Sequence, residues 1–147
     1  MTNNISQLFD QLLDAWNRHD AKSAAKFYDE NIVWKDYSMP EPFTGIEGAT
    51  RVFKMWDTAF PDFKIRVLNK LVGEDMIAFQ MEFTGTHTGP LEFPDMQIPA
   101  THKKVTGTDA NFLKFRNGKL YEVHDYPDVQ GMMAQLELQT IAGQSAF

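Results

Sequence analysis

An aspartate near the C-terminal end of the chain is the first residue whose surroundings suggest chemistry. Asp125 lies in the segment 122–128, EVHDYPD, at the end of an expected strand. A carboxyl group among aromatic and apolar side chains loses hydration, so its pKa rises and it can exchange a proton near neutral pH. A solvated turn aspartate is the alternative interpretation, and Asp128 is better explained as the N-cap of a following helix. We predict that Asp125 is an acid–base group at one end of a pocket.

The sequence offers few other groups for catalysis or metal binding. It contains no cysteine, which removes thiolate nucleophiles, thiolate zinc sites and disulfides. No glycine-rich phosphate loop, serine nucleophile elbow or dinucleotide-binding fingerprint is present. The histidines show no metal-ligand spacing; they are His19, His87, His102 and His124. Only His87, at the end of an expected strand, is a candidate for the pocket mouth, and we expect neither a metal nor a cofactor.

Aromatic and sulfur-containing side chains are abundant: there are 12 Phe, 3 Trp, 4 Tyr and 8 Met. A densely packed core explains this composition, and so does a cavity that holds a flat apolar ligand. The net charge of −6 argues against nucleic acid or an anionic membrane as the partner. Without an apolar run of membrane-spanning length or a basic, apolar leader, the sequence predicts a cytoplasmic protein.

The elements that position Asp125 begin with helices, because apolar side chains recur at spacings of three and four in the first sixty residues. Thr2 or Asn3 can cap the first helix and Asp20 the second, and Pro61 stops the third. The expected elements in this part are helices over about 5–16, 20–28 and 49–60, and a strand over 32–37.

After residue 62 the hydrophobic period changes to two, which predicts strands. The expected strands cover about 63–67, 77–84, 104–115 and 119–126. The segment 85–101 contains three prolines and is expected to be an irregular loop, and Asp128 begins a short final helix. Helices followed by antiparallel strands predict an α+β fold, with three N-terminal helices on the concave side of a curved sheet. With no repeat or linker, residues 1–147 are expected to form a single domain.

Two registers are possible for the hairpin formed by the last two strands. A two-residue turn at Asn117-Gly118 would place Asn111 beside His124. A three-residue loop with a bulge at Gly118 would instead put Asn111 and Asp125 on one face. The two registers differ by one residue, which changes the face of every side chain on the second strand. The hydrophobic pattern favours the three-residue loop, which gathers on the inner face Asn111, Leu113, Phe115, Tyr121, Val123 and Asp125.

The same alternation predicts which other side chains surround Asp125. Phe112 and Leu120 fall on the outer face of the sheet and leave it partly apolar, which favours a homodimer or homotetramer built from that face. The residues expected to form the pocket wall and bind the substrate are Trp16, Trp34, Phe53, Trp56, Phe79, Met81, Phe83 and Leu113, with His87 near its mouth.

The C-terminal third of the chain is similar to the closing motif of the SnoaL-like polyketide cyclases. That motif is a Gly-Lys-Ile hairpin, an Asp-Trp-Pro-Asp turn and a Gln-Gly helix that ends in Gln-Leu. Here residues 117–120 read NGKL and residues 124–136 read HDYPDVQGMMAQL. Weaker similarity extends over the rest of the chain, at Trp16-Asn17, Phe43-Thr44-Gly45, Gly48-Ala49 and Thr88-Gly89-Pro90.

The resemblance implies the conical, cystatin-like α+β fold of the nuclear transport factor two superfamily, in which a sheet curls around one long helix. It also implies intramolecular aldol condensation of an aromatic polyketide by an aspartate acid–base, without a metal. That aspartate corresponds to Asp125, and the histidine that assists it corresponds to Asn111. Because an amide can hydrogen-bond a carbonyl or an enolate but cannot donate a proton as an imidazolium does, the sequence departs from the family at Asn111.

Three functions agree with this resemblance. The first is a cyclase- or isomerase-type enzyme acting on a small apolar or aromatic carbonyl compound, and the second is a non-catalytic binding protein of the same fold. The third is the chemistry of other branches of the superfamily. Epoxide hydrolysis requires an Asp–Arg–Asp cluster, whereas Arg51, Arg66 and Arg116 are expected on polar faces or in a turn. Steroid isomerisation requires a second, protonated acid near a tyrosine, a role that Asp109 and Tyr37 would fill only by coincidence.

Overall fold

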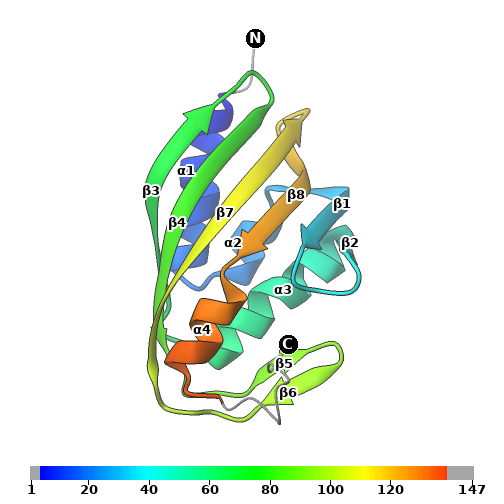
Figure 1. Cartoon of the computed structure of the whole chain (residues 1–147). Helices are drawn as coiled ribbons and strands as arrows, with labels where there is room; N and C mark the ends of the chain where they lie inside the picture. Colours follow the sequence, from blue (N-terminus) through cyan, green and yellow to red (C-terminus); the bar gives the residue numbers. More distant parts are fainter. Residues whose placement is uncertain (1–3, 139–147) are drawn as a thin grey trace.

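A long, strongly curved sheet with helices along its length dominates the computed structural model, which describes residues 4–138 (Figure 1). The helices and strands are, in order, α1 (Ile5–Asn17), α2 (Ala21–Ala25), β1 (Tyr28–Asp36), β2 (Phe43–Thr44), α3 (Gly45–Ala59), β3 (Lys64–Val72), β4 (Met76–Thr86), β5 (Leu91–Phe93), β6 (Met96–Ile98), β7 (Lys104–Arg116), β8 (Lys119–Pro127) and α4 (Val129–Gln135). Three N-terminal helices and a curved, largely antiparallel sheet confirm the predicted α+β class.

Short polar side chains define where the helices begin. The side chain of Asn4 caps α1, so the predicted caps Thr2 and Asn3, which lie outside the described residues, are not needed for this role. Asp20 and Asp128 cap α2 and α4 as predicted, each accepting a hydrogen bond from the backbone N–H three residues later. No helix within residues 4–138 is long and apolar enough to span a membrane.

The main sheet has the strand order β2-β1-β8-β7-β4-β3. Every neighbouring pair is antiparallel except β1 and β8, which run parallel, so the sheet is mixed at this point rather than wholly antiparallel as expected. The parallel pair brings a strand from the first quarter of the chain beside the last strand, with Asp36 opposite Asp125. Three strands, β1, β8 and β7, therefore meet around Asp125.

The turn between β7 and β8 contains only Asn117 and Gly118, and Arg116 pairs with Lys119. Both turn residues have positive φ angles, +52° and +73°, which a two-residue turn of this type requires and which Asn-Gly adopts readily. The prediction of a three-residue loop with a bulge at Gly118 was therefore wrong.

A bulge lies further along the hairpin instead, at Tyr121 in β8. It shifts the register by one residue, so that Asn111 lies directly opposite Asp125, on the same inner face. The predicted grouping of these two residues is thus correct, although the turn that was expected to cause it is not. Leu120 precedes the bulge, pairs with Phe115 and is 1% exposed; its predicted place on the outer face was wrong.

The segment 85–101 is not wholly irregular, since it contains the small hairpin β5–β6. Leu91 and Ile98 are buried there and give the hairpin an apolar underside. The backbone N–H groups of Thr88 and Gly89 donate to the carbonyl oxygen of Ala59 at the end of α3. The hairpin is therefore attached to the C-terminal end of α3, as Figure 1 shows.

Helix α4 lies against β7 beyond the point where β8 ends (Figure 1). There the side-chain amide of Gln135 accepts a hydrogen bond from the Thr106 N–H, at 2.7 Å, and donates one to the Thr106 carbonyl, at 2.8 Å. An amide side chain thus takes the place of the missing neighbour strand and satisfies both backbone groups.

Candidate active site

An apolar cavity lies between α1, α3 and the inner face of the sheet, with α4 at one end. Its apolar lining includes Phe9, Leu12, Trp16, Trp34, Val52, Trp56, Phe79, Met81, Phe83, Leu113 and Met132, and its polar groups come from Thr108, Asp109, Asn111, Asp125 and Asp128. Most of the wall would suit a flat, apolar molecule, and the polar groups gather near the β7–β8 pair.

Most of the residues predicted for the pocket wall line this cavity. They are Trp16, Trp34, Trp56, Phe79, Met81, Phe83 and Leu113. Phe53 does not line it, because the ring is 1% exposed and packs 4.6 Å from the ring of Trp16. The alternation of side chains along the strands therefore predicted which residues of β4 and β7 face the cavity. The helical pattern did not distinguish residues of the core from residues that line the cavity.

His87 does not reach the cavity either, contrary to the expectation for the pocket mouth. The residue is completely buried at the end of β4, where its Nδ1 accepts a hydrogen bond from the Thr101 N–H at 3.2 Å. Its ring stacks on Phe60 at a centroid distance of 5.3 Å. Burial lowers the pKa of the imidazole, so His87 is a neutral core residue beneath the segment that leads to β5.

Asp125 lies on the inner face of β8 and is 8% exposed. Burial raises its pKa well above the usual aspartate range, and the neighbouring Asp109 carboxyl raises it further. The side-chain atom Oδ1 has no hydrogen-bond partner. No ion pair within residues 4–138 involves Asp125, so no cation opposes the rise.

Asp109 is a second carboxyl group in the cavity, and it was missed as a site residue. It precedes Asn111 by two residues in β7 and thus shares its face, where the Asn111 side chain donates to Asp109 Oδ1 at 3.1 Å. Burial raises the pKa of Asp109 to about 6, and the charge of Asp36 adds to the rise. The period of two would have revealed Asp109 in the sequence, had the inner face been extended one position further.

The third acidic side chain is Asp36, which lies opposite Asp125 on β1 and is 4% exposed. Its Oδ1 accepts hydrogen bonds from the backbone N–H and the hydroxyl of Ser38, at 2.8 and 2.6 Å. Burial raises the pKa of Asp36 too, although the two bonds from Ser38 oppose the rise. Asp36 does not line the cavity, and its effect there is electrostatic.

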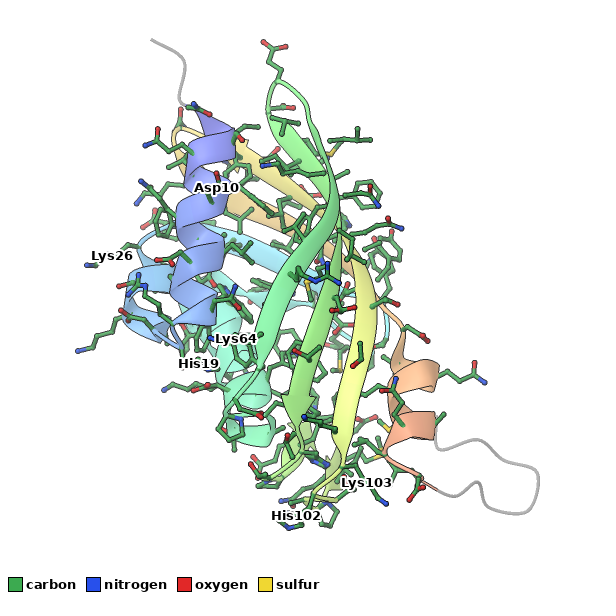
Figure 2. The ribbon with its side chains drawn as sticks, turned by 90° about the vertical axis from the view of Figure 1, so that its left-hand side faces the viewer. Asp10, His19, Lys26, Lys64, His102 and Lys103 are labelled. Carbon is green, nitrogen blue, oxygen red and sulfur yellow. The ribbon has the colours of Figure 1, made fainter. Side chains whose placement is uncertain are left out.

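The acidic end of the cavity, formed by Asp109 and Asp125, has no basic side chain in its described lining. None of the described residues that line the cavity is Lys, Arg or His. Figure 2 shows Lys26 extending outward beyond the helices, and His102 and Lys103 at the far end of the sheet. Arg66 has an exposed side chain and pairs with Glu82 instead. The described residues therefore form no Asp–Arg–Asp cluster of the kind expected for epoxide hydrolysis.

The carboxyl groups of Asp109 and Asp125 titrate as a pair, because each influences the proton affinity of the other. With both pKa values raised and no cation nearby, the pair holds a proton at a pH well above the range in which an ordinary aspartate loses it. Such a pair offers a carboxylate and a neutral carboxylic acid in the same cavity, which is what general acid–base catalysis requires.

The sequence matches the profile of the SnoaL-like polyketide cyclases over residues 6–136. The chain therefore belongs to the SnoaL-like polyketide cyclase family. No match was found among curated protein sequences.

Solved structures show the same fold. AclR from Streptomyces galilaeus, described as a candidate hydroxylase, is 25% identical with a TM-score of 0.76, over 91% of this chain and 96% of AclR. IdmH from Streptomyces antibioticus, described as a candidate polyketide cyclase, is 23% identical with a TM-score of 0.75, over 92% of this chain and all of IdmH. TsrD from Streptomyces laurentii is 21% identical with a TM-score of 0.76, over 92% of this chain and 98% of TsrD.

Proposed function

We propose that this protein is an enzyme that moves a proton at a carbon atom next to a carbonyl group, as in the intramolecular aldol condensation of a polyketide-like compound. The observation that carries the proposal is the pair of carboxyl groups, Asp109 and Asp125, in an apolar cavity whose described lining has no basic side chain. Membership of the SnoaL-like polyketide cyclase family supports it. The substrate would be a small apolar or aromatic carbonyl compound, and the reaction would use no metal or cofactor.

In this proposal the two carboxyl groups share one proton, and the form that reacts is the one in which Asp109 carries that proton and Asp125 is the carboxylate that acts as the base. Its Oδ1 accepts no hydrogen bond from the protein, whereas Asp109 Oδ1 accepts one from Asn111, so Asp125 has the oxygen that is free for a substrate proton. A carboxylate with a raised pKa is also a stronger base than an ordinary aspartate. When Asp125 removes the proton, the carbon–hydrogen bond breaks and the electrons move onto the carbonyl oxygen as an enolate.

Asp109 supplies the proton that the product needs. The enolate carbon attacks a second carbonyl of the same molecule, a carbon–carbon bond forms, and the new alkoxide takes the proton of Asp109. The proton on Asp125 then passes to Asp109, which returns the pair to its starting state. One proton leaves the substrate for Asp125 and one returns from Asp109, so this aldol addition gives a product of the same composition as the substrate and requires no oxidant, reductant or leaving group.

Asn111 occupies the position that corresponds to the histidine of the family, but its role in this proposal is different. Its Nδ2 donates to Asp109 at 3.1 Å, so in this proposal the amide orients the acid. The second N–H of Nδ2 remains for a carbonyl or enolate oxygen, which is the role expected from the sequence.

Exchange of deuterium from the solvent into an enolisable aromatic ketone tests this function without the natural substrate. Asp125→Asn keeps the shape of the side chain but removes the base, so exchange should fall by roughly two or more orders of magnitude, while affinity changes little. Asp10→Asn is a matched control, since Asp10 is exposed on α1 (Figure 2). Full exchange by Asp125→Asn would exclude Asp125 as the base.

A non-catalytic binding protein is the second candidate function. The observation in its favour is Asn111 itself, which cannot donate a proton as the imidazolium of the family's histidine does. If the wild-type protein and Asp125→Asn bind aromatic ketones equally well and neither catalyses exchange, the cavity serves binding alone.

A further inference from the structure

A buried polar atom without a hydrogen-bond partner marks a place where a ligand could supply that partner. Within residues 4–138 three buried side-chain atoms have no hydrogen-bond partner: Trp34 Nε1, His87 Nε2 and Asp125 Oδ1. Trp34 and Asp125 both line the cavity, whereas His87 does not. One unsatisfied donor and one unsatisfied acceptor therefore belong to the same site.

Trp34 lies on β1 opposite Val123 of β8, two positions before the pairing of Asp36 with Asp125. Residues two apart on a strand share a face, so the indole is on the inner face beside the acidic end of the cavity. The side chain is fixed by its neighbours: its ring lies 5.7 Å from that of Trp16, and the residue is 8% exposed.

The neighbouring indole, that of Trp16, differs from Trp34 because its N–H has a hydrogen-bond acceptor in the protein. Trp16 also lines the cavity, but Trp16 Nε1 donates to the hydroxyl of Tyr28 at 3.1 Å. The fold thus supplies an acceptor for one buried indole and none for the other. Trp16 is a natural control for any effect that comes from ring contact alone.

The indole of Trp34 also faces Asp125. Its N–H partly opposes the rise in the pKa of Asp125, as a nearby donor does. The indole N–H is close enough to affect the Asp125 carboxyl as a side-chain hydrogen bond does, but its geometry is not that of a formed hydrogen bond, since Nε1 and Oδ1 both remain without a partner. A ligand oxygen that reaches Nε1–H could accept from the indole in place of this imperfect contact, while the adjacent carbon or hydroxyl of the ligand gives a proton to the carboxylate.

We propose that Trp34 Nε1–H donates a hydrogen bond to an oxygen of the ligand, and that this oxygen is the carbonyl oxygen that becomes the enolate. The assignment to the reacting carbonyl rests on the proposed function, whereas the hydrogen bond itself does not. The site therefore selects a flat, apolar molecule that carries a carbonyl or phenolic oxygen. It rejects the same molecule without that oxygen, because the indole N–H would then stay buried and unpaired.

The experiment uses 2-naphthol as a mimic of an aromatic enolate and naphthalene as the same body without oxygen. With ¹⁵N-labelled tryptophan, the Nε1–H resonance of Trp34, identified by its loss in Trp34→Phe, should lie further downfield in the 2-naphthol complex than in the naphthalene complex, since both probes have the same ring system and only 2-naphthol has an oxygen. Trp34→Phe keeps an aromatic ring and should weaken binding of 2-naphthol by roughly tenfold, the effect of one buried hydrogen bond. Trp16→Phe should affect both probes equally.

Two results would overturn the proposal: a Trp34 resonance at the same position in the 2-naphthol and naphthalene complexes, or an equal loss of affinity for both probes in Trp34→Phe. The resonance of the wild-type protein decides the question even if Trp34→Phe folds poorly, because the chain has three tryptophans and Trp16→Phe and Trp56→Phe identify the other two resonances. If the resonance differs between the two complexes but no ketone exchanges deuterium, the hydrogen bond stands and the proposed enzyme function fails. If exchange occurs while the resonance is the same in both complexes, the enzyme function stands and this inference fails.

Discussion

Asp109 of β7 and Asp125 of β8 face the same apolar cavity from neighbouring strands. Burial raises the pKa of both carboxyl groups, and Asp36 adds a third acidic side chain from β1. In a folded protein, buried acids are usually paired with cations or hydrogen-bond donors. Here the fold keeps cations away from them within residues 4–138, which favours proton exchange over ion pairing.

This arrangement has a cost in stability that depends on pH. Asp109 has a pKa of about 6 in the folded protein, above that of an unfolded aspartate, so the folded state binds more protons between these two values. The favourable contribution is complete below the unfolded pKa and is lost as the pH rises through about 6. Asp109→Asn should therefore raise the free energy of unfolding by roughly 1–3 kcal/mol at pH 8 and by little at pH 4.

Urea unfolding of the wild-type protein and Asp109→Asn at pH 4, 6 and 8 measures this difference. An exposed aspartate, Asp14, provides the control, since it lies on the solvent side of α1 and Asp14→Asn should show no gain at pH 8. If Asp109→Asn destabilised the protein by the same amount at every pH, the raised pKa of Asp109 would be contradicted.

The attachment of the β5–β6 hairpin depends on a glycine. A Cβ at Gly89 would lie 2.0 Å from the backbone oxygen of Thr58, and backbone atoms cannot move aside as a flexible side chain can. Gly89→Ala should lower the free energy of unfolding by roughly 2 kcal/mol or more. Gly107→Ala, where no atom lies within 4 Å of the added Cβ, should change it by less than roughly 0.5 kcal/mol. If Gly89→Ala and Gly107→Ala had equal effects on thermal unfolding, the close contact between residue 89 and the Thr58 backbone would be refuted.

Gln135 should hold α4 at the end of the cavity. Gln135→Ala removes both hydrogen bonds to the Thr106 backbone, and leaving these groups unpaired should cost roughly 1–2 kcal/mol. Hydrogen exchange at the Thr106 N–H should become faster. Gln130→Ala, on the exposed side of α4, is the control and should leave that amide unchanged. Unaltered exchange in Gln135→Ala would show that packing alone fixes α4.

The outer face of the sheet remains the predicted contact between copies of the chain, although Leu120 does not belong to it. Tyr37, Phe112 and Tyr126 are 44%, 39% and 46% exposed, and the rings of Tyr37 and Tyr126 stack at 4.3 Å. We expect a homodimer or homotetramer at micromolar concentration, and Phe112→Glu should dissociate it by placing a charge in an apolar contact. Light scattering that shows a wild-type monomer would contradict this prediction.

Local patterns were sufficient to predict the fold and the position of Asp125. Alternation along β7 and β8 placed Asn111 and Asp125 on one face, and the C-terminal motif indicated the family. The turn at Asn117-Gly118 was assigned incorrectly because a bulge at Tyr121, which no local rule specifies, restored the register. Asp36 joined the site only through the parallel pairing of β1 and β8, a contact between distant segments that periodicity does not reveal.

The distinction between core and lining residues also required the structure. Phe53 and Trp16 lie on neighbouring helices with equally apolar patterns, yet only Trp16 reaches the cavity. Whether a buried ring faces a void or another ring depends on how the helices approach the sheet. His87 was misplaced for the same reason, since the path of the segment after β4 decides its surroundings.

Whether Asp109 and Asp125 share a proton can be measured by titration of the aspartate carboxyl groups. The titration is followed by ¹³C NMR with labelled aspartate, and the two resonances are assigned with Asp109→Asn and Asp125→Asn. We expect Asp109 to titrate near pH 6 and Asp125 well above the ordinary aspartate range, with each substitution altering the titration of the remaining partner. If both Asp109 and Asp125 instead lose their protons near the ordinary aspartate pKa of about 4, the pair cannot hold a proton at neutral pH, and the proposed acid–base chemistry is contradicted.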